Sequence, residues 1–263
     1  MDRFRWLEFG DAEPQPREEG EGAPEPRARD FLARAEELLL DGEPERALRD
    51  FARAVAEDRG LFDAWAGQVT SHLAMDELPQ ARVWAEKALE LFPDSPRVLS
   101  VASRVLARLG FVEEALKLSD QALELSRGRV PAALWLERAE ALLLARRREP
   151  AEDCLSQVRA SVGADPDWLQ RIGETFLAAG QPELAAREFA SALERKPERA
   201  WLWYLAARAA RALLQDERAR FFLDKALALK PGLEPARQER NALRQAPAPW
   251  LSTLLGWLGR RDV

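Results

Sequence analysis

The residue types that carry most enzyme chemistry are scarce in this chain of 263 residues. It holds one histidine, His72, and one cysteine, Cys154, so we expect no metal site built from nitrogen and sulfur ligands. Neighbouring acids such as Glu36 and Glu37 are typical of a solvated helix surface rather than of an acid–base pair. The sequence contains no glycine-rich phosphate loop and no nucleophile elbow. We therefore predict a protein that is not an enzyme and needs no cofactor.

Residues 166–199 show which elements would position any functional side chain. Apolar and small residues recur at helical spacing in the first half of this stretch, and a second such stripe fills the other half. Gly180 and Pro182 separate the stripes, since glycine ends helices and proline begins them. Pro197 ends the second stripe because proline cannot continue a helix. The stretch therefore predicts a helical hairpin of 34 residues.

A small residue of the second predicted helix recurs along the chain with a nearly constant period. It is alanine each time: Ala47, Ala81, Ala115, Ala151, Ala185 and Ala219. The spacing is 34 residues, except for 36 residues between Ala115 and Ala151. The two extra residues fall near 126–131 and predict a longer loop there. The period predicts six helical hairpins that stack through close contacts at these alanines.

This pattern resembles the tetratricopeptide repeat, which has small residues at positions 8, 20 and 27, aromatic residues at 11 and 24, and proline at 32. In residues 166–199 the matching side chains are Leu169 near position 4, then Gly173, Phe176, Ala185, Phe189, Ala192 and Pro197. The resemblance implies an all-α, right-handed solenoid of six such hairpins over residues 28–232. Residues 233–246 then predict a capping helix. In this register His72 and Cys154 fall at packing sites.

The resemblance also implies that ligands lie along the concave face, on positions 2, 5, 9, 12 and 13 of each first helix. At those positions the chain offers a basic patch and a second patch of aromatic and basic residues. These candidate partner-binding residues are Arg97, Arg104, Arg108, Trp201, Tyr204, Arg208 and Arg211. Arginine suits carboxylates, and aromatic rings anchor peptides. The alternative is that the arginines pair with Glu140, Glu174 or other nearby acids and bind nothing.

Charge and composition narrow the class of partner and the compartment. The net charge of −6 and pI near 5.2 argue against nucleic acid as the main partner. A single cysteine excludes an internal disulfide framework and suits a reducing compartment. No signal peptide and no membrane-spanning run is evident, so we expect a cytoplasmic protein. The preference for arginine over lysine hints at a GC-rich bacterial genome.

Both ends of the chain carry apolar side chains that the repeats do not account for. Residues 1–27 begin with an aromatic tip and continue as an acidic linker, predicted to be flexible. The tip could occupy the chain's own concave groove or recruit a partner. Residues 247–263 predict an amphipathic tail that could fold back, dock on a partner or lie on a membrane surface. The candidate docking residues are Phe4, Trp6, Leu7, Phe9, Trp250, Leu254, Trp257 and Leu258.

Taken together, the sequence predicts an adaptor that holds a peptide or protein partner in a concave groove. The main alternative is an assembly factor attached to a membrane surface through residues 250–261. A third class is a regulatory subunit that works by oligomerisation. The sequence identifies neither the partner nor the oligomeric state.

Overall fold

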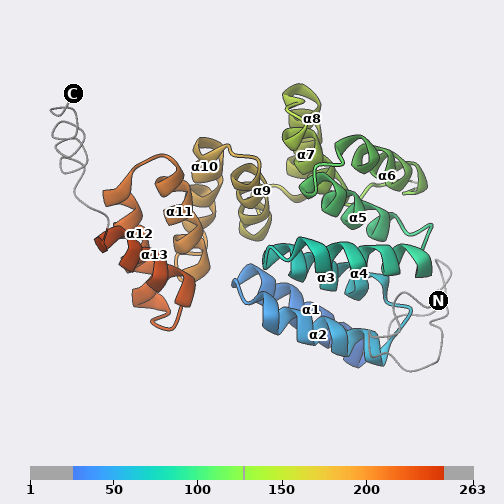
Figure 1. Ribbon diagram of the computed structural model, residues 1–263, viewed down its shortest axis with the longest axis horizontal. Helices are drawn as coiled ribbons and strands as arrows, with labels where there is room; N and C mark the ends of the chain where they lie inside the picture. The colour runs from blue at the N-terminus through green and yellow to red at the C-terminus, as the bar shows by residue number, and fades with distance from the viewer. Residues whose placement is uncertain (1–25, 127, 246–263) are drawn as a thin grey trace, which may run out of the picture.

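The computed structural model describes residues 26–126 and 128–245, and within these residues the chain is all-helical (Figure 1). The helices are α1 (Pro26–Leu40), α2 (Pro44–Glu57), α3 (Phe62–Ala74), α4 (Leu78–Leu91), α5 (Pro96–Arg108), α6 (Val112–Leu125), α7 (Ala132–Leu144), α8 (Arg148–Val162), α9 (Pro166–Ala178), α10 (Pro182–Leu193), α11 (Ala200–Ala212), α12 (Asp216–Leu229) and α13 (Glu234–Gln245). Each odd-numbered helix up to α11 packs on the helix that follows it, and α13 packs on α12.

The turns inside the helix pairs share one backbone conformation. One residue of each turn has a positive φ: Gly42, Asp76, Gly110, Arg146, Gly180 and Leu214, with φ between 59° and 89°. Paired backbone bonds close these turns, as where Gly42 N donates to Leu39 O and Glu43 N to Leu38 O. This is a Schellman-type helix end, in which a left-handed residue satisfies the last carbonyls. The turn phase therefore follows the same period as the alanines.

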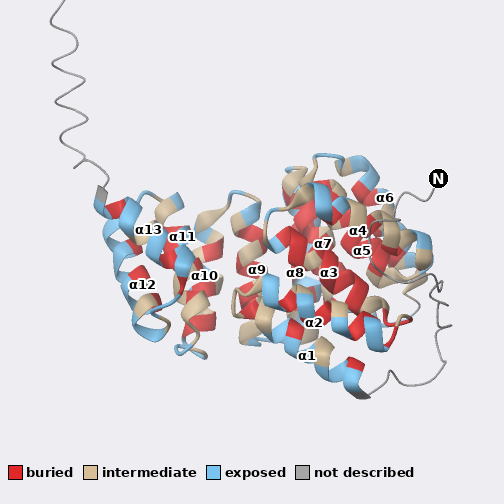
Figure 2. Ribbon diagram, turned by 60° about the horizontal axis from the view of Figure 1, so that its bottom comes forward, coloured by how far each residue is buried: buried red, intermediate tan, exposed pale blue. Residues whose placement is uncertain are grey.

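The recurring alanines lie in the packed interior of the solenoid. All of Ala47, Ala81, Ala115, Ala151, Ala185 and Ala219 are 0 % exposed. The small residues at position 27 of each repeat are buried as well, from Ala54 to Ala226. Figure 2 shows buried residues gathered on the inner sides of the helices, with exposed residues on the outside. The expectation that short side chains recurring in step let successive helices nest is confirmed.

The two residues that could have carried chemistry are both part of the packing. His72 is 7 % exposed, its ring stacks 6.3 Å from Trp84, and its Nδ1 lies 2.7 Å from Glu77 Oε2. Cys154 is 5 % exposed within α8, and burial raises the pKa of its thiol. Both therefore occupy the packing sites that the repeat register predicts.

The first helices of successive pairs lie side by side and form one continuous face. Packing runs from α1 to α3, α5, α7, α9 and α11 in turn. The stack curves so far that the turn between α1 and α2 reaches α9 and α11 (Figure 1). The Nε2 atom of Gln170, a residue fully buried in α9, donates a 2.9 Å hydrogen bond to the carbonyl of Leu40. The concave face is therefore bounded by the stacked first helices and, at the place where the two ends of the stack meet, by the turn between α1 and α2.

Candidate functional site

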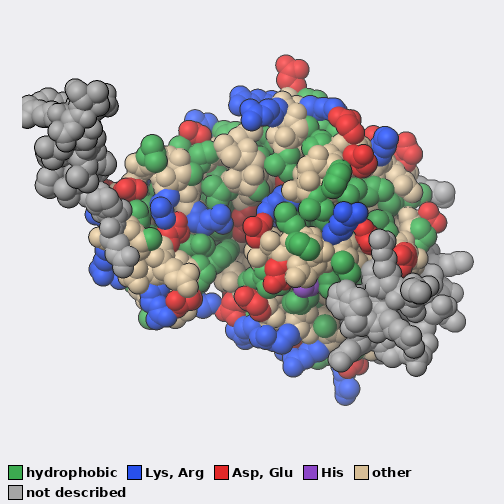
Figure 3. All heavy atoms as spheres, viewed as in Figure 1, with side chains coloured by type: hydrophobic (Ala, Val, Ile, Leu, Met, Phe, Trp, Pro, Cys, Tyr) green, Lys and Arg blue, Asp and Glu red, His purple; other side chains and the backbone are tan. Residues whose placement is uncertain are grey.

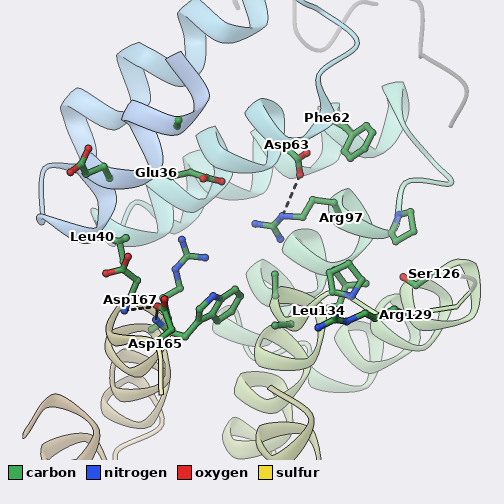
Figure 4. A pocket seen from close by; sticks show the side chains of 18 of the residues that line it. Glu36, Leu40, Phe62, Asp63, Arg97, Ser126, Arg129, Leu134, Asp165 and Asp167 are labelled. Atoms are coloured by element: carbon green, nitrogen blue, oxygen red, sulfur yellow. Dashed lines mark hydrogen bonds and ion pairs between the residues drawn. The ribbon is translucent and has the colours of Figure 1, made fainter. Parts of the chain in front are cut away.

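The concave face encloses two cavities of about 830 and 490 Å³. They have several wall residues in common, contributed by α1, α3, α5, α7 and α9. Among the shared residues are Glu36, Leu40, Asp63, Arg97, Ala133, Trp168 and Arg171. Because the walls are shared, we treat the two cavities as one space and call it the lumen. Figure 4 shows the larger cavity, with Glu36, Asp63 and Arg97 reaching into it from three different helices.

The predicted basic patch lies on the lumen wall, and each of its arginines is ion-paired. Arg97 Nη1 lies 2.7 Å from Glu137 Oε1, and Arg104 Nε lies 2.7 Å from Glu140 Oε2. Arg108 contacts Asp76 at 3.2 Å and Glu140 at 3.5 Å. Arg97 Nη1 donates to Glu137 and Arg104 Nε donates to Glu140, and these hydrogen bonds join α5 to α7. This is the arrangement that the sequence left open as the alternative to ligand binding.

The acids of this network are unusually well buried. Glu140 is 1 % exposed and Glu137 is 7 % exposed. Glu137 accepts hydrogen bonds from Arg97 and from the hydroxyl of Ser100. A buried carboxylate without such partners would be strongly destabilising. We call these ion pairs between α5 and α7 the Arg–Glu ladder. The ladder holds the concave face together, and the positive charge of its arginines is largely neutralised.

The second predicted patch is divided between structural and unpaired side chains. Trp201 and Tyr204 lie together on α11 with ring centroids 4.7 Å apart. Arg211 Nη1 contacts Glu239 Oε1 of α13 at 3.2 Å. Arg208 lines the smaller cavity, is exposed, and forms no ion pair with any residue that the structure describes. Among the described residues, Arg208 is therefore the predicted cation that stays available to a ligand.

The lumen also contains a cation and an aromatic ring that sequence reasoning did not assign to it. The guanidinium of Arg171 lies 4.9 Å from the centroid of the Trp168 ring, and both side chains line both cavities. Within the described part of the chain Arg171 forms no ion pair. The sequence placed Trp168 in a packing stripe. Its three-residue spacing from Arg171 on one helix face was the available signal.

Loss of water inside the lumen affects several carboxylates in the same direction. Burial raises the pKa of Asp63, and the nearby Arg97 guanidinium partly opposes this. Burial likewise raises the pKa of Glu174, opposed by the Gln170 hydrogen bond and by Arg104 and Arg171. Raised pKa values show that the cations present do not fully compensate these acids. The lumen is thus a polar, partly desolvated space with charges of both signs.

Other predicted sites lie outside the described residues. These are the aromatic tip with Phe4, Trp6, Leu7 and Phe9, and the tail with Trp250, Leu254, Trp257 and Leu258. Within residues 26–126 and 128–245, no group of three or more His, Cys, Asp and Glu side chains is arranged to hold a metal ion. None of the described helices combines the length and the apolar character needed to span a bilayer.

Comparison with known proteins supports the fold. No family model and no curated protein matches the sequence. Among solved structures, a thermophilic TPR protein of Thermus thermophilus is 25% identical, with a TM-score of 0.51 over 71% of this chain and 99% of that one. A human IFIT1 dimer with PPP-AAAA has the same TM-score at 20% identity, over 73% of this chain and 48% of that one. The pilus biogenesis factor PilW is 20% identical over 81% of this chain and 98% of that one, with a TM-score of 0.48.

The overall likeness to the first of these structures supports the repeat pattern that the buried alanines, the shared turn conformation and the stacked helix pairs show in this chain. The chain has the fold of the tetratricopeptide-repeat proteins.

Proposed function

We propose that the chain is a non-catalytic adaptor that binds an extended segment of a protein partner in the lumen. The observation that carries this proposal is the lumen itself, since its volume lies in the range of ligand sites and several successive helices build its walls. An extended segment fits such a space better than a folded domain does. The binding residues are those that form no ion pair within the described residues, above all Arg171, which lies over the Trp168 ring, and Arg208.

A carboxylate-bearing partner segment suits these residues best. Arg171 and Arg208 carry paired donors that match a carboxylate, and Trp168 offers an aromatic surface beside one of them. Nucleic acid is a poorer fit, because Glu137 and Glu140 already neutralise the arginines of the ladder. Positive and negative side chains are also interspersed over the face in Figure 3, with no continuous basic stripe.

Site-specific photo-cross-linking in cells tests this proposal in the full chain. We would place a photoreactive amino acid at Ala133, which lines both cavities, and at Arg187, an exposed residue of α10 that lines neither. We expect one protein to be captured at Ala133 and not at Arg187. The captured peptide should be an extended segment with acidic residues, and Arg171→Glu should reduce its yield at least tenfold. Equal capture at both positions would contradict binding in the lumen.

The N-terminal tip is proposed as an internal competitor for the same lumen. Residues 10–25, if they behave as a random coil, span roughly 22 Å. The lumen begins near Ala33, about 10 Å along α1 from Pro26. Phe4 and Trp6 are therefore within reach at high effective concentration. Changing both to alanine should raise cross-linking at Ala133, and an unchanged or lower yield would count against competition.

The alternative function is attachment to a membrane surface through residues 250–261. It is supported by the one-sided distribution of Trp250, Leu254, Trp257 and Leu258 when the tail is drawn as a helix. Co-sedimentation with anionic liposomes should then depend on these side chains. A full chain that stays in the supernatant would remove this alternative while leaving binding in the lumen unaffected.

A further inference from the structure

The turn between α1 and α2 is bound by the opposite end of the solenoid. Gln170 Nε2 donates to the Leu40 carbonyl at 2.9 Å, and Arg199 Nε lies 3.3 Å from Asp41 Oδ1. Lys230 Nζ lies 2.5 Å from Glu43 Oε1. These contacts join residues that are 130 to 187 positions apart in the sequence. Neighbour-to-neighbour stacking alone does not require any of them.

A fourth contact, between Gly42 of the turn and Trp201 of α11, lies among these three. A Cβ atom built on Gly42 would lie 2.1 Å from Cδ2 of the Trp201 indole, which is far inside contact distance. The left-handed backbone at this position does not by itself demand glycine. Asp76, Arg146 and Leu214 occupy the equivalent place in other turns with φ near 60°. Glycine at position 42 is therefore explained by the approach of the indole ring.

The same contacts complete the walls of the lumen. Leu40 and Gly42 from the turn line the smaller cavity together with Trp201, Leu205 and Arg208 from α11. These walls come from opposite ends of the solenoid, and they meet because the turn lies on α11. Separating them would break a few side-chain contacts without unfolding any helix pair.

We propose that residues 40–43, Gln170, Arg199, Trp201 and Lys230 form a clasp that closes the solenoid into a ring, and that opening of this clasp controls access to the lumen. The part about access rests on the proposed function, whereas ring closure does not. In the closed ring, short flexible segments and small molecules reach the lumen. Bulkier guests enter after the clasp opens, because the stacked helices can separate slightly without losing their neighbours.

Distances between spin labels test closure in the absence of any partner. Labels at Glu45→Cys on α2 and Glu217→Cys on α12 occupy exposed positions on the two sides of the clasp. We expect one narrow distance distribution in the parent and in Gly180→Ala, whose new methyl group meets open space. Gly42→Ala should shift the distribution to longer distances. The same distribution for both alanine variants would overturn the clasp.

A charge exchange gives a second test that adds no steric clash. Glu43→Lys should lengthen the distance through repulsion from Lys230, and adding Lys230→Glu should restore it. Failure of the double variant to restore the short distance, with both proteins folded by circular dichroism, would also overturn the proposal.

Access is measured with a thiol inside the lumen at Ala133→Cys. Cys154 is 5 % exposed and is replaced by alanine in every sample. We expect N-ethylmaleimide to react at similar rates in all variants. A maleimide on a 5-kDa polyethylene glycol, on the order of the smallest protein domains, should react about tenfold faster in Gly42→Ala than in Gly180→Ala.

Equal polymer rates in the two glycine variants would show that the clasp does not limit access. Ring closure could then still be read from the spin-label distances, and partner binding in the lumen from cross-linking at Ala133. The failure of one idea is therefore distinguishable from the failure of the other.

Discussion

Gly173 in α9 lies against the ring of Phe189 in α10, so closely that a Cβ atom at position 173 would be 2.5 Å from Cε1 of the ring. Both residues are buried, and Phe189 is 0 % exposed. The two helices of this pair can approach to their observed distance because position 173 has no side chain. The same relationship recurs between Gly67 and Phe51, where the distance would be 2.3 Å.

Gly173→Ala should therefore destabilise the protein although alanine is the better helix former. Helix propensity favours alanine by about 1 kcal/mol, whereas overpacking a core costs about 1–3 kcal/mol, so the steric effect prevails. Urea unfolding followed by circular dichroism measures the difference. In a double-mutant cycle, Phe189→Leu should remove most of the added penalty, and additive effects would contradict the contact.

Ala185→Glu should be far more damaging than the same change at Ala190 on the same helix. Ala185 is 0 % exposed and packs between helices, whereas Ala190 is exposed. A glutamate at position 185 combines overpacking with a buried charge and should cost more than the roughly 1–3 kcal/mol of overpacking alone. Thermal unfolding should show a large loss for Ala185→Glu and almost none for Ala190→Glu. Similar losses would contradict the close helix contact.

The features that the sequence predicted correctly are those that repeat locally. The positions of Ala47 and Ala185 follow from periodicity, and a small side chain there is required by each neighbouring helix pair. The clasp could not be predicted in this way, because Gly42 looks like any other turn glycine and nothing near it points to Trp201. The pairing of Arg104 with Glu140 was named only as an alternative, since the curvature of the stack decides which charges meet.

Leu214→Gly is expected to stabilise the chain. Leu214 has φ 59° and is 89% exposed, so it adopts a left-handed conformation while its side chain packs on little. That conformation costs a residue with a Cβ about 1–2 kcal/mol, and glycine avoids this cost. Glycine also loses more backbone entropy on folding, which reduces the gain by about 0.5–1 kcal/mol. The net gain should be roughly 0.5–1 kcal/mol in chemical unfolding. A loss of stability would show that the exposed leucine side chain makes contacts that matter.

Because Arg104 is paired with Glu140, we expect substitutions of the basic patch to destabilise the protein. A loss of binding in such variants would then reflect unfolding as well as the lost contact with a ligand. Glu140 is 1 % exposed, and its Oε2 lies 2.7 Å from Arg104 Nε. Removing one partner of a buried pair costs up to about 3–5 kcal/mol because the other charge stays buried, and Arg108, 3.5 Å from Glu140, offsets part of that cost here. Arg104→Met should therefore lower the melting temperature strongly. The double change Arg104→Met with Glu140→Met should recover much of the loss, and no recovery would mean that the pair is not coupled.

Arg208→Glu is the suitable comparison for that experiment. Arg208 forms no ion pair within the described residues and is exposed, so its reversal should leave the melting temperature within about 1 °C, a surface effect of a few tenths of a kcal/mol. A reduced cross-linking yield with unchanged stability would then be attributable to the lumen surface.

Glu174 gives a prediction for the pH dependence of stability. Burial raises its pKa, and the Gln170 hydrogen bond and the Arg104 and Arg171 charges only partly oppose this. Because the folded-state pKa lies above the unfolded value of about 4.3, the native protein binds this proton more tightly than the unfolded chain does. The charged carboxylate therefore lowers stability above the folded-state pKa, and the effect disappears as pH falls below the unfolded value.

Glu174→Gln should accordingly raise the melting temperature relative to the parent at pH 7, and the difference should shrink towards pH 4. The glutamine keeps the shape of the side chain and can still bond Gln170, so the main change is the loss of a titrating charge in a desolvated space. Glu183→Gln, at an exposed position of α10, should show no such pH-dependent difference. If Glu174→Gln instead lowered the melting temperature at pH 7, and this loss disappeared towards pH 4, the nearby cations would stabilise the charged carboxylate more than burial penalises it. The lumen would then be less desolvated than its walls indicate.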